Sequence, residues 1–531
     1  MDKLNWGTMA CAVFVLCVAA AMSLPAQTFN TLHSFDYTDG AQPFAGLLQA
    51  TDGNLYGTTL GGGANGNYGT VFQITTTGTL TTLYNFCLLS GCTDGAGPTA
   101  LVQGTDGNFY GTTQGGGANG EGTVFKITPS GNLTTLYSFC SQSGCTDGII
   151  PNAGLVLASD GNLYGTTSGG GVHGNYGTVF QITTTGTLFK TLYSFCSQSN
   201  CKDGWNPEAA LVQATDGKLY GTTVGGGVNG NYGTVFQITT TGTLFKTLYN
   251  FCSKPNCKDG QQPAAGLVQA TDGNFYGTTS GGGVHGNYGT VFQITPTGTL
   301  NTLYSFCSQS NCKDGWNPEA ALVQATDGNF YGTTLDGGAP DGGTVFKLTG
   351  STLTTLHSFD GTNGSRPFAG LVQATDGNFY GTTYVGGPYG WGTVFSLDAG
   401  LGPVVSLSPT TLTFGPQGVS APNVPQVVTL TNTGELPLSI TGITVTGQNS
   451  GDFAQVNNCP ISPNTLAAGD SCMITVYFFP VGAGTLAAAV TVTDNAPGSP
   501  QNVPLSGVGV SGKPGLAGPT GQRQTAEPGR P

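Results

Sequence analysis

The stretch Thr271-Asp-Gly-Asn-Phe-Tyr-Gly-Thr-Thr279 decides the fold, because versions of it occur seven times along the chain. Self-similarity at a fixed period marks a tandem-repeat protein, so each copy belongs to a larger structural module. The tyrosine of the motif recurs at intervals of 49 to 56 residues, at Tyr56, Tyr110, Tyr164, Tyr220, Tyr276, Tyr331 and Tyr380.

Each module is predicted to contain four short strands, which we name A to D. In the first module they are Ala45–Ala50, Asn54–Thr59, Gly69–Ile74 and Thr81–Phe86. They are rich in β-branched and aromatic residues and are bounded by glycine, as strands typically are. Asp-Gly and Thr-Gly pairs predict tight turns between A and B and between C and D. Longer loops join B to C and D to the next A.

The seventh module lacks its strand D. Its strands A to C are predicted at Ala369–Ala374, Asn378–Thr383 and Gly392–Leu397, whereas a lone D-type strand stands ahead of the first module at Thr28–Phe35. Propellers avoid an exposed sheet edge by closing the ring. The sequence therefore predicts an all-β fold, with a seven-bladed β-propeller over residues 27–400 closed by the N-terminal strand. An open β-solenoid is the alternative.

The repeated Tyr-Gly-Thr-Thr, the Gly-rich loop, Gly-Thr-Val-Phe and Leu-Tyr-Ser-Phe resemble the GloVer tandem repeat of secreted bacterial proteins. The resemblance covers roughly Thr28–Asp398. It implies an extracellular location, and it supplies no catalytic residue to transfer.

Residues 404–511 have a different composition and are predicted to form an immunoglobulin-like β-sandwich. Motifs such as Asn432-Thr-Gly434 and Gly469-Asp-Ser-Cys472 resemble the choice-of-anchor D domain, a hydin-type immunoglobulin-like module. That resemblance implies a spacer or a protein-contact role. Residues 512–531 form a polar Gly/Pro-rich tail that we expect to be disordered. The predicted sandwich strands are Thr411–Phe414, Val427–Asn432, Leu438–Val445, Cys472–Phe479, Ala487–Thr493 and Val503–Val510.

Residues 1–26 read as a secretory signal peptide, with Lys3 followed by an apolar run and a Leu-Pro-Ala cleavage site. No later segment is expected to span a membrane. An even number of cysteines after cleavage favours disulfides in an oxidising, extracellular compartment. A metal site is the alternative, but four histidines supply too few further ligands, so we expect no metal and no cofactor. The predicted pairs are Cys87/Cys92, Cys140/Cys145, Cys196/Cys201, Cys252/Cys257, Cys307/Cys312 and Cys459/Cys472.

The negative charge of the chain excludes nucleic acid as a partner. The formal net charge is −13 and Lys and Arg together number 14, so the chain lacks the basic stripe that nucleic-acid binding requires. We expect a monomer whose partner is an extracellular glycan or a surface protein.

The long B–C and D–A loops are predicted to share one rim of the propeller, and function tends to reside on loops held by a rigid scaffold. Aromatic side chains on this rim suit the stacking of sugar rings, or they pack over neighbouring Gly-rich loops. The candidate ligand-binding residues are Tyr68, Tyr176, Trp205, Tyr232, Tyr288, Trp316 and Trp391.

No catalytic residue is predicted, because the sequence contains no Ser/His/Asp order, phosphate loop or activated cysteine. An aspartate in most D–A loops precedes glycine, so we interpret it as a turn residue rather than a cation ligand. We therefore expect a secreted, non-enzymatic binding or adhesion protein. The alternatives are a carbohydrate-active enzyme, a glycosidase or lyase, and a structural surface-layer component. The loop acids are Asp39, Asp94, Asp147, Asp203, Asp259 and Asp314.

Overall fold

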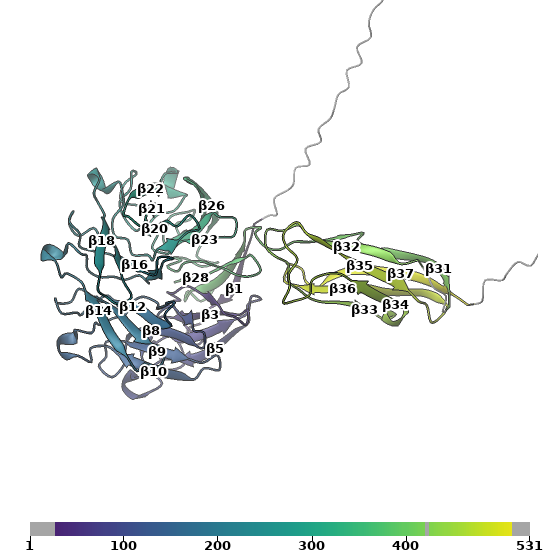
Figure 1. The fold of residues 1–531 in the computed structure, drawn as a ribbon, viewed down its shortest axis with the longest axis horizontal. Coiled ribbons are helices and arrows are strands. Elements are labelled where there is room, and N and C mark those ends of the chain that lie inside the picture. The colour runs from purple at the N-terminus through teal and green to yellow at the C-terminus, as the bar shows by residue number, and fades with distance from the viewer. Residues whose placement is uncertain (1–26, 420–423, 512–531) are drawn as a thin grey trace, which may run out of the picture.

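The computed structural model describes residues 27–419 and 424–511, and their regular secondary structure consists of β-strands apart from a few short 3-10 turns (Figure 1). The signal peptide predicted over residues 1–26 and the tail predicted over residues 512–531 lie outside the described residues. Two parts follow one another along the chain. The repeat part is a propeller-like array of small sheets, and the C-terminal part is a sandwich of two sheets.

Each repeat folds into an antiparallel meander, as predicted. In the first module β2 (Leu48–Gln49), β3 (Leu55–Thr59), β4 (Thr70–Ile74) and β5 (Leu80–Asn85) pair in chain order. The corresponding strands of the second, third and fourth modules are β7 (Val102–Gln103), β8 (Phe109–Gly115), β9 (Thr123–Ile127) and β10 (Leu133–Ser138); β11 (Val156–Leu157), β12 (Asn162–Thr167), β13 (Thr178–Thr183) and β14 (Phe189–Ser194); and β15 (Val212–Gln213), β16 (Leu219–Thr223), β17 (Thr234–Ile238) and β18 (Phe245–Asn250).

The later modules repeat this arrangement. The second module also carries an extra strand, β6 (Ala96–Pro98), which pairs with β8. The strands of the fifth, sixth and seventh modules are β19 (Val268–Gln269), β20 (Phe275–Thr279), β21 (Thr290–Ile294) and β22 (Leu300–Ser305); β23 (Val323–Gln324), β24 (Phe330–Thr334), β25 (Thr344–Thr349) and β26 (Thr352–Ser358); and β27 (Val372–Gln373), β28 (Phe379–Thr383) and β29 (Thr393–Asp398).

Strand A is shorter than predicted: only two of the six residues Ala45–Ala50 pair with β3. The reason is that the residues before the pair bind the adjacent module instead. In the fifth module, for example, the carbonyl of Ala265 accepts a hydrogen bond of 3.0 Å from the hydroxyl of Thr222 in the fourth. These segments line the middle of the repeat part.

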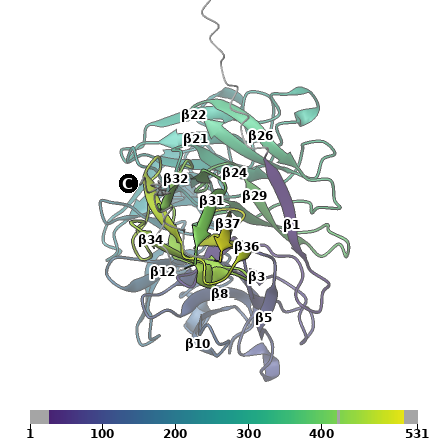
Figure 2. The same cartoon turned by 90° about the vertical axis from the view of Figure 1, so that its right-hand side faces the viewer.

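The lone N-terminal strand β1 (Thr28–Ser34) lies antiparallel to β29. Pairing runs from Thr28 opposite Asp398 to Ser34 opposite Thr393, with a bulge near Thr31. The sheet order β1-β29-β28-β27 therefore joins the two ends of the repeat part, and Figure 2 shows the purple β1 beside the green β29.

Side-chain amides tie neighbouring sheets together at the start of six of the seven repeat motifs. Gln103 accepts a hydrogen bond of 3.1 Å from the backbone NH of Thr51 in the preceding module. Gln49 accepts the same bond from Thr375, at 2.9 Å, which links the first module to the seventh. The third module carries Leu157 at the glutamine position, so it cannot make this tie to the second.

The repeated motif builds both the turn and the contact between modules. In the fifth module the hydroxyl of Tyr276 donates to the carboxylate of Asp272 at 2.8 Å, which closes the A–B turn. Thr278 donates to the carbonyl of Ala320 in the next module at 3.1 Å. Thr279 pairs with Thr290 on β21 at 2.8 Å. The aspartate, the tyrosine and the last two threonines of the motif therefore have structural roles.

The hydrophobic core of the repeat part lies between adjacent modules. One cluster joins Tyr56 and Phe86 of the first module to Phe109 and Phe125 of the second. An equivalent cluster joins Phe35, which directly follows β1, to Phe72 and other residues of the first module together with Tyr380 and Val394 of the seventh. Packing therefore continues across the junction between the two ends of the repeat part.

The C-terminal part consists of two four-stranded sheets around one core. One sheet has the order β30-β32-β35-β34 and the other the order β31-β37-β36-β33. The sequence prediction missed β30 and β34, which are short edge strands with several exposed residues and therefore give little hydrophobic signal. The strands are β30 (Val405–Ser408), β31 (Leu412–Gly418), β32 (Gln426–Asn432), β33 (Ile440–Thr446), β34 (Phe453–Asn457), β35 (Ser471–Phe478), β36 (Gly484–Asp494) and β37 (Gln501–Val510).

Candidate functional site

A disulfide closes each of the five D–A loops that contain a cysteine pair. Each contains a short 3-10 turn that ends at the second cysteine, such as Pro255–Cys257. All six predicted disulfides are confirmed, and they indicate an oxidising, extracellular environment. The bonds are Cys87–Cys92, Cys140–Cys145, Cys196–Cys201, Cys252–Cys257, Cys307–Cys312 and Cys459–Cys472.

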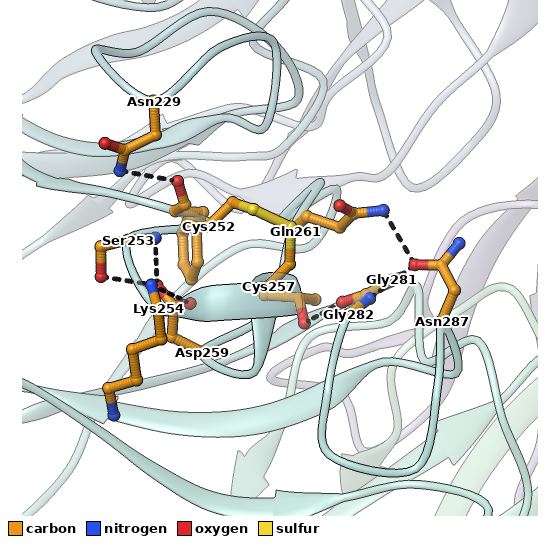
Figure 3. The surroundings of a disulfide bond; sticks show 12 residues. Asn229, Cys252, Ser253, Lys254, Cys257, Asp259, Gln261, Gly281, Gly282 and Asn287 are labelled. Atoms are coloured by element: carbon orange, nitrogen blue, oxygen red, sulfur yellow. Dashed lines mark hydrogen bonds between the residues drawn. A yellow bond between two sulfur atoms is a disulfide. The ribbon is translucent and has the colours of Figure 1, made fainter.

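The aspartate of each disulfide-closed loop accepts hydrogen bonds from the loop around it, as Figure 3 shows for Asp259. Asp259 is fully buried. Its carboxylate accepts hydrogen bonds from the Tyr249 hydroxyl at 2.8 Å and from the backbone NH groups of Ser253 and Lys254 at 2.9 and 3.0 Å. Burial, together with the adjacent negative carboxylate, raises the pKa of Tyr249 to about 12. Sequence reasoning recognised the Asp-Gly turn but missed the tyrosine ten residues earlier.

The two D–A loops without cysteines have a histidine in place of the tyrosine that binds the loop aspartate. His33 takes the tyrosine position and its Nε2 lies 2.7 Å from the carboxylate of Asp39. His357 faces the amide of Asn363 at 3.1 Å, and burial lowers the pKa of this histidine. Across the described ranges, no cluster of three or more His, Cys, Asp and Glu side chains could hold a metal ion.

The seven predicted aromatic residues lie on the long-loop rim but do not form one platform. Trp316 meets Tyr288 edge-on at 6.1 Å between ring centroids, whereas Trp391 contacts Tyr37, at 5.0 Å. The tyrosines rest on their own Gly-rich loops: a Cβ added to Gly286 would lie 2.9 Å from the ring of Tyr288. Tyr68 and Trp391 are the most exposed, at 40% and 39%.

A cavity of about 260 Å³ lies where the A segments of all seven modules meet. Its narrow part is a ring of small residues, because neighbouring segments approach closely there; a Cβ on Gly370 would lie 3.0 Å from the carbonyl oxygen of Ala321. None of the seven predicted aromatic residues lines it. The small residues are Gly46, Ala100, Gly154, Ala210, Gly266, Ala321 and Gly370.

Six modules add one further residue to this cavity, at the middle position of a Pro-Xaa-Ala segment. The second module is one residue shorter here, and Gln114 lines the cavity from that module instead. This position varies between modules while its neighbours stay the same, which is a signal that comparison of the repeats could have found. The residues are Phe44, Asn152, Glu208, Ala264, Glu319 and Phe368.

One wall of the cavity is aromatic. The rings of Phe44 and Phe368, from the first and seventh modules, lie 5.2 Å apart between centroids. Tyr384 supports both, at 6.3 Å from Phe44 and 5.2 Å from Phe368. This wall is only half-buried, so its rings remain open to a ligand.

Two glutamates give the cavity its charge. Asn206 donates a hydrogen bond of 2.8 Å to Glu208. Burial raises the pKa of both Glu208 and Glu319, and the negative charge of Glu208 raises that of Glu319 further. No lysine, arginine or histidine is among the described residues that line this cavity. The site can therefore offer aromatic faces, an amide and two carboxyl groups to one small ligand.

Comparison with known families identifies the repeat. The family model described as the Gloeobacter/Verrucomicrobia repeat matches residues 18–156, 141–313 and 307–424. The chain belongs to this family. The GloVer resemblance inferred from the repeated motifs is thus confirmed for the repeat part.

The GloVer-repeat chain also resembles solved structures, although weakly. It is 12% identical to a PQQ-bound aldose sugar dehydrogenase from Streptomyces coelicolor, covering 71% of this chain and 99% of that one with a TM-score of 0.36. It is 13% identical to the polysaccharide lyase Uly1, covering 71% and 94% with a TM-score of 0.40. These values are too low to transfer any property.

A further solved structure is similar over a shorter stretch of the chain. An ASH/PapD-like domain of human CEP192 is 21% identical, covering 20% of this chain and 87% of that one with a TM-score of 0.15. No curated protein matches the sequence.

Proposed function

We propose that this GloVer-repeat chain is a secreted binding protein, and that the central cavity of its repeat part binds carbohydrate. The observation that carries the proposal is the cavity itself, where Phe44 and Phe368 face the same space as Asn152, Glu208 and Glu319. Ligand sites are typically concave, with apolar surface and a few polar groups that fix orientation. Aromatic faces combined with amide and carboxyl groups suit the apolar face and the hydroxyl groups of a sugar ring.

The size of the cavity favours a small ligand. Its volume of about 260 Å³ lies just below the range of roughly 300–1,000 Å³ that is usual for small-molecule sites. We therefore propose that it receives a single saccharide unit or the end of a chain, and that the aromatic rim from Tyr68 to Trp391 is a second contact surface for glycan or protein.

The proposal includes a seven-bladed propeller closed by β1. Three observations support it: β1 pairs with β29, Gln49 binds Thr375 as Gln103 binds Thr51, and one cavity is lined by all seven modules. An open solenoid would leave the first and last modules apart.

We propose the same division into domains as the sequence indicates. Residues 1–26 would direct secretion, residues 27–400 would bind ligand, residues 404–511 would act as an immunoglobulin-like spacer of the choice-of-anchor D type, and residues 512–531 would form a polar tail. The disulfides suit release from the cell or attachment to its surface. Within the described residues, no helix is long and apolar enough to cross a membrane.

A glycan array with the full mature chain tests the proposal. We expect binding by the wild type and its loss in the Phe44→Ala/Phe368→Ala variant, because stacking needs both rings. The Trp205→Ala/Trp316→Ala variant removes rim aromatics that do not line the cavity and serves as the comparison. If the rim variant alone loses binding, the rim is the site. If the wild type binds no glycan, the proposal fails and a structural surface-layer role remains.

A second candidate function is glycoside hydrolysis, and the two glutamates favour it. Glycosidases use one protonated carboxyl as acid and a second carboxylate as base or nucleophile. The raised pKa of Glu319, beside the charge of Glu208, suits the acid role. Release of reducing ends from polysaccharides, abolished separately by Glu208→Gln and Glu319→Gln, would establish this function. Binding without release in the wild type would exclude it for the glycans tested.

A further inference from the structure

The two glutamates of the central cavity, Glu208 and Glu319, are half-buried. Carboxylates removed from water are usually paired with a cation, because an isolated charge is costly in a low-dielectric site. Glu208 and Glu319 have amide neighbours, Asn206 and Asn317. Neither glutamate forms an ion pair within residues 27–419 and 424–511.

A nearby carboxylate shows the contrast. Asp336 lies close enough to Glu319 to affect it electrostatically, but Asp336 has its own cation, because Arg366 approaches it at 3.6 Å. The fold therefore neutralises the acid that does not line the cavity and leaves the two that line it without a counter-charge.

The aromatic wall of the cavity suits a cation as well. The ring faces of Phe44 and Phe368 carry negative electrostatic potential, and such faces attract ammonium groups that come within about 6 Å of a ring centre. No side chain that lines the cavity is positively charged. The whole chain adds to this bias through its net charge of −13, which raises the local concentration of cationic ligands.

We propose that the ligand of the central cavity carries a positively charged amino group, so that the preferred saccharide is an unacetylated amino sugar. The ammonium group supplies the counter-charge for Glu208 and Glu319, and the sugar ring stacks on Phe44 and Phe368. This inference rests on the proposed carbohydrate-binding function and names the class of ligand for the same cavity.

Calorimetric titration of the full mature chain tests the inference with three probes of equal length: glucosamine, N-acetylglucosamine and glucose oligosaccharides. We expect the glucosamine probe to bind about tenfold or more tightly than the other two, which is the effect of one well-formed ion pair. Affinity should fall as salt concentration increases, since exposed parts of the interaction are screened.

Variants separate the charge from the rest of the site. Glu208→Gln/Glu319→Gln keeps the shape of the cavity and should reduce glucosamine affinity to the level of the neutral probes. Glu121→Gln removes an acid that does not line the cavity and should change nothing. Thermal melting of each variant at the wild-type temperature shows that the fold is intact.

The outcomes distinguish this inference from the function on which it rests. Equal affinity for neutral and amino oligosaccharides would overturn the inference and leave carbohydrate binding in place. Calcium that competes with glucosamine and binds alone would also overturn it, because the carboxylates would then hold a metal ion. Absence of binding by every oligosaccharide would contradict both the amino-sugar inference and the proposed carbohydrate-binding function.

Discussion

At the scale of single residues, the glycine after each motif tyrosine is required by packing and not by an unusual backbone. A Cβ on Gly111 would lie 2.6 Å from the ring of Phe125 and 3.1 Å from the side chain of Leu101. Both neighbours are buried in the core between modules. The chain passes close to the phenylalanine of strand C because no side chain intervenes.

The same strand provides a matched pair for measuring this effect. Gly111→Ala should lower the free energy of unfolding by about 1–3 kcal/mol, the usual effect of overpacking a core. Gly115→Ala, also on β8, should be nearly neutral, because a Cβ there meets only backbone oxygens at 3.9 Å. Urea denaturation measures both, and equal effects would contradict the packing explanation.

Tyrosines that bind aspartate make stability depend on alkaline pH. Burial and hydrogen bonds to aspartate raise the pKa of several tyrosines from 10.0 to about 12 in the folded chain. The folded state then holds protons that the unfolded state releases, so stability is complete below pH about 10 and decreases as pH rises toward about 12. The residues are Tyr110, Tyr137, Tyr249, Tyr276 and Tyr304.

Denaturant midpoints measured from neutral to strongly alkaline pH check this expectation. The phenolate absorbance of these tyrosines should appear only as the chain unfolds. Tyr137→Phe removes one titrating group and should make the alkaline loss smaller. A denaturant midpoint that stays constant up to pH about 12 would show that these hydroxyls do not titrate differently in the two states.

At the scale of elements, the strand pattern of each module could be predicted because hydrophobic alternation, Asp-Gly turns and Gly-rich loops repeat together. The short pairing of strand A could not, since it depends on hydrogen bonds to the next module, such as that from Thr222 to Ala265. The candidate cavity was missed for the same reason. Its residues come from separate modules far apart in the sequence, and only the tertiary fold brings Glu208, Glu319, Phe44 and Phe368 to one cavity.

Strand β1 gives a test of the pairing between the two ends of the repeat part. Deletion of residues 28–35 should sharply lower the melting temperature, because it removes the partner of β29 and exposes a sheet edge together with the contacts of Phe29 and Phe35. A synthetic peptide of residues 28–35, added in excess, should restore part of the loss by binding the folded form.

A scrambled peptide of the same composition is the control for this experiment. An unchanged melting temperature after the deletion would show that β1 adds nothing to the stability of the fold. It would contradict the proposal of a closed propeller. Recovery with the scrambled peptide would show that the effect does not depend on strand pairing.

At the scale of the whole molecule, the two parts have separate cores. The buried cluster of the sandwich, which includes Cys459 and Cys472, contains no residue of the repeat part. The clusters of the repeat part likewise stay between its own modules. The chain should therefore unfold in two transitions.

Removal of single disulfides can distinguish the two unfolding transitions. Cys459 and Cys472 enclose a larger loop, with a sequence separation of 13 against 5 for the repeat disulfides. Cys459→Ser/Cys472→Ser should destabilise the sandwich by about 3 kcal/mol on the chain-entropy account. Cys196→Ser/Cys201→Ser should lower the other transition by about 2 kcal/mol. Calorimetry checks both, and a single transition shifted by either change would show that the two parts unfold together.

The pairing of β1 with β29 also has a consequence for biosynthesis. The ribosome makes β1 before any other strand of the repeats and makes β29 after all of them. At about 5–20 residues per second, β1 waits roughly 20–70 s for its partner. During that time a neighbouring nascent chain on the same messenger RNA can accept β1 into its own last sheet. The order of translation thus opens a route to strand-exchanged dimers that a refolded, full-length chain does not meet.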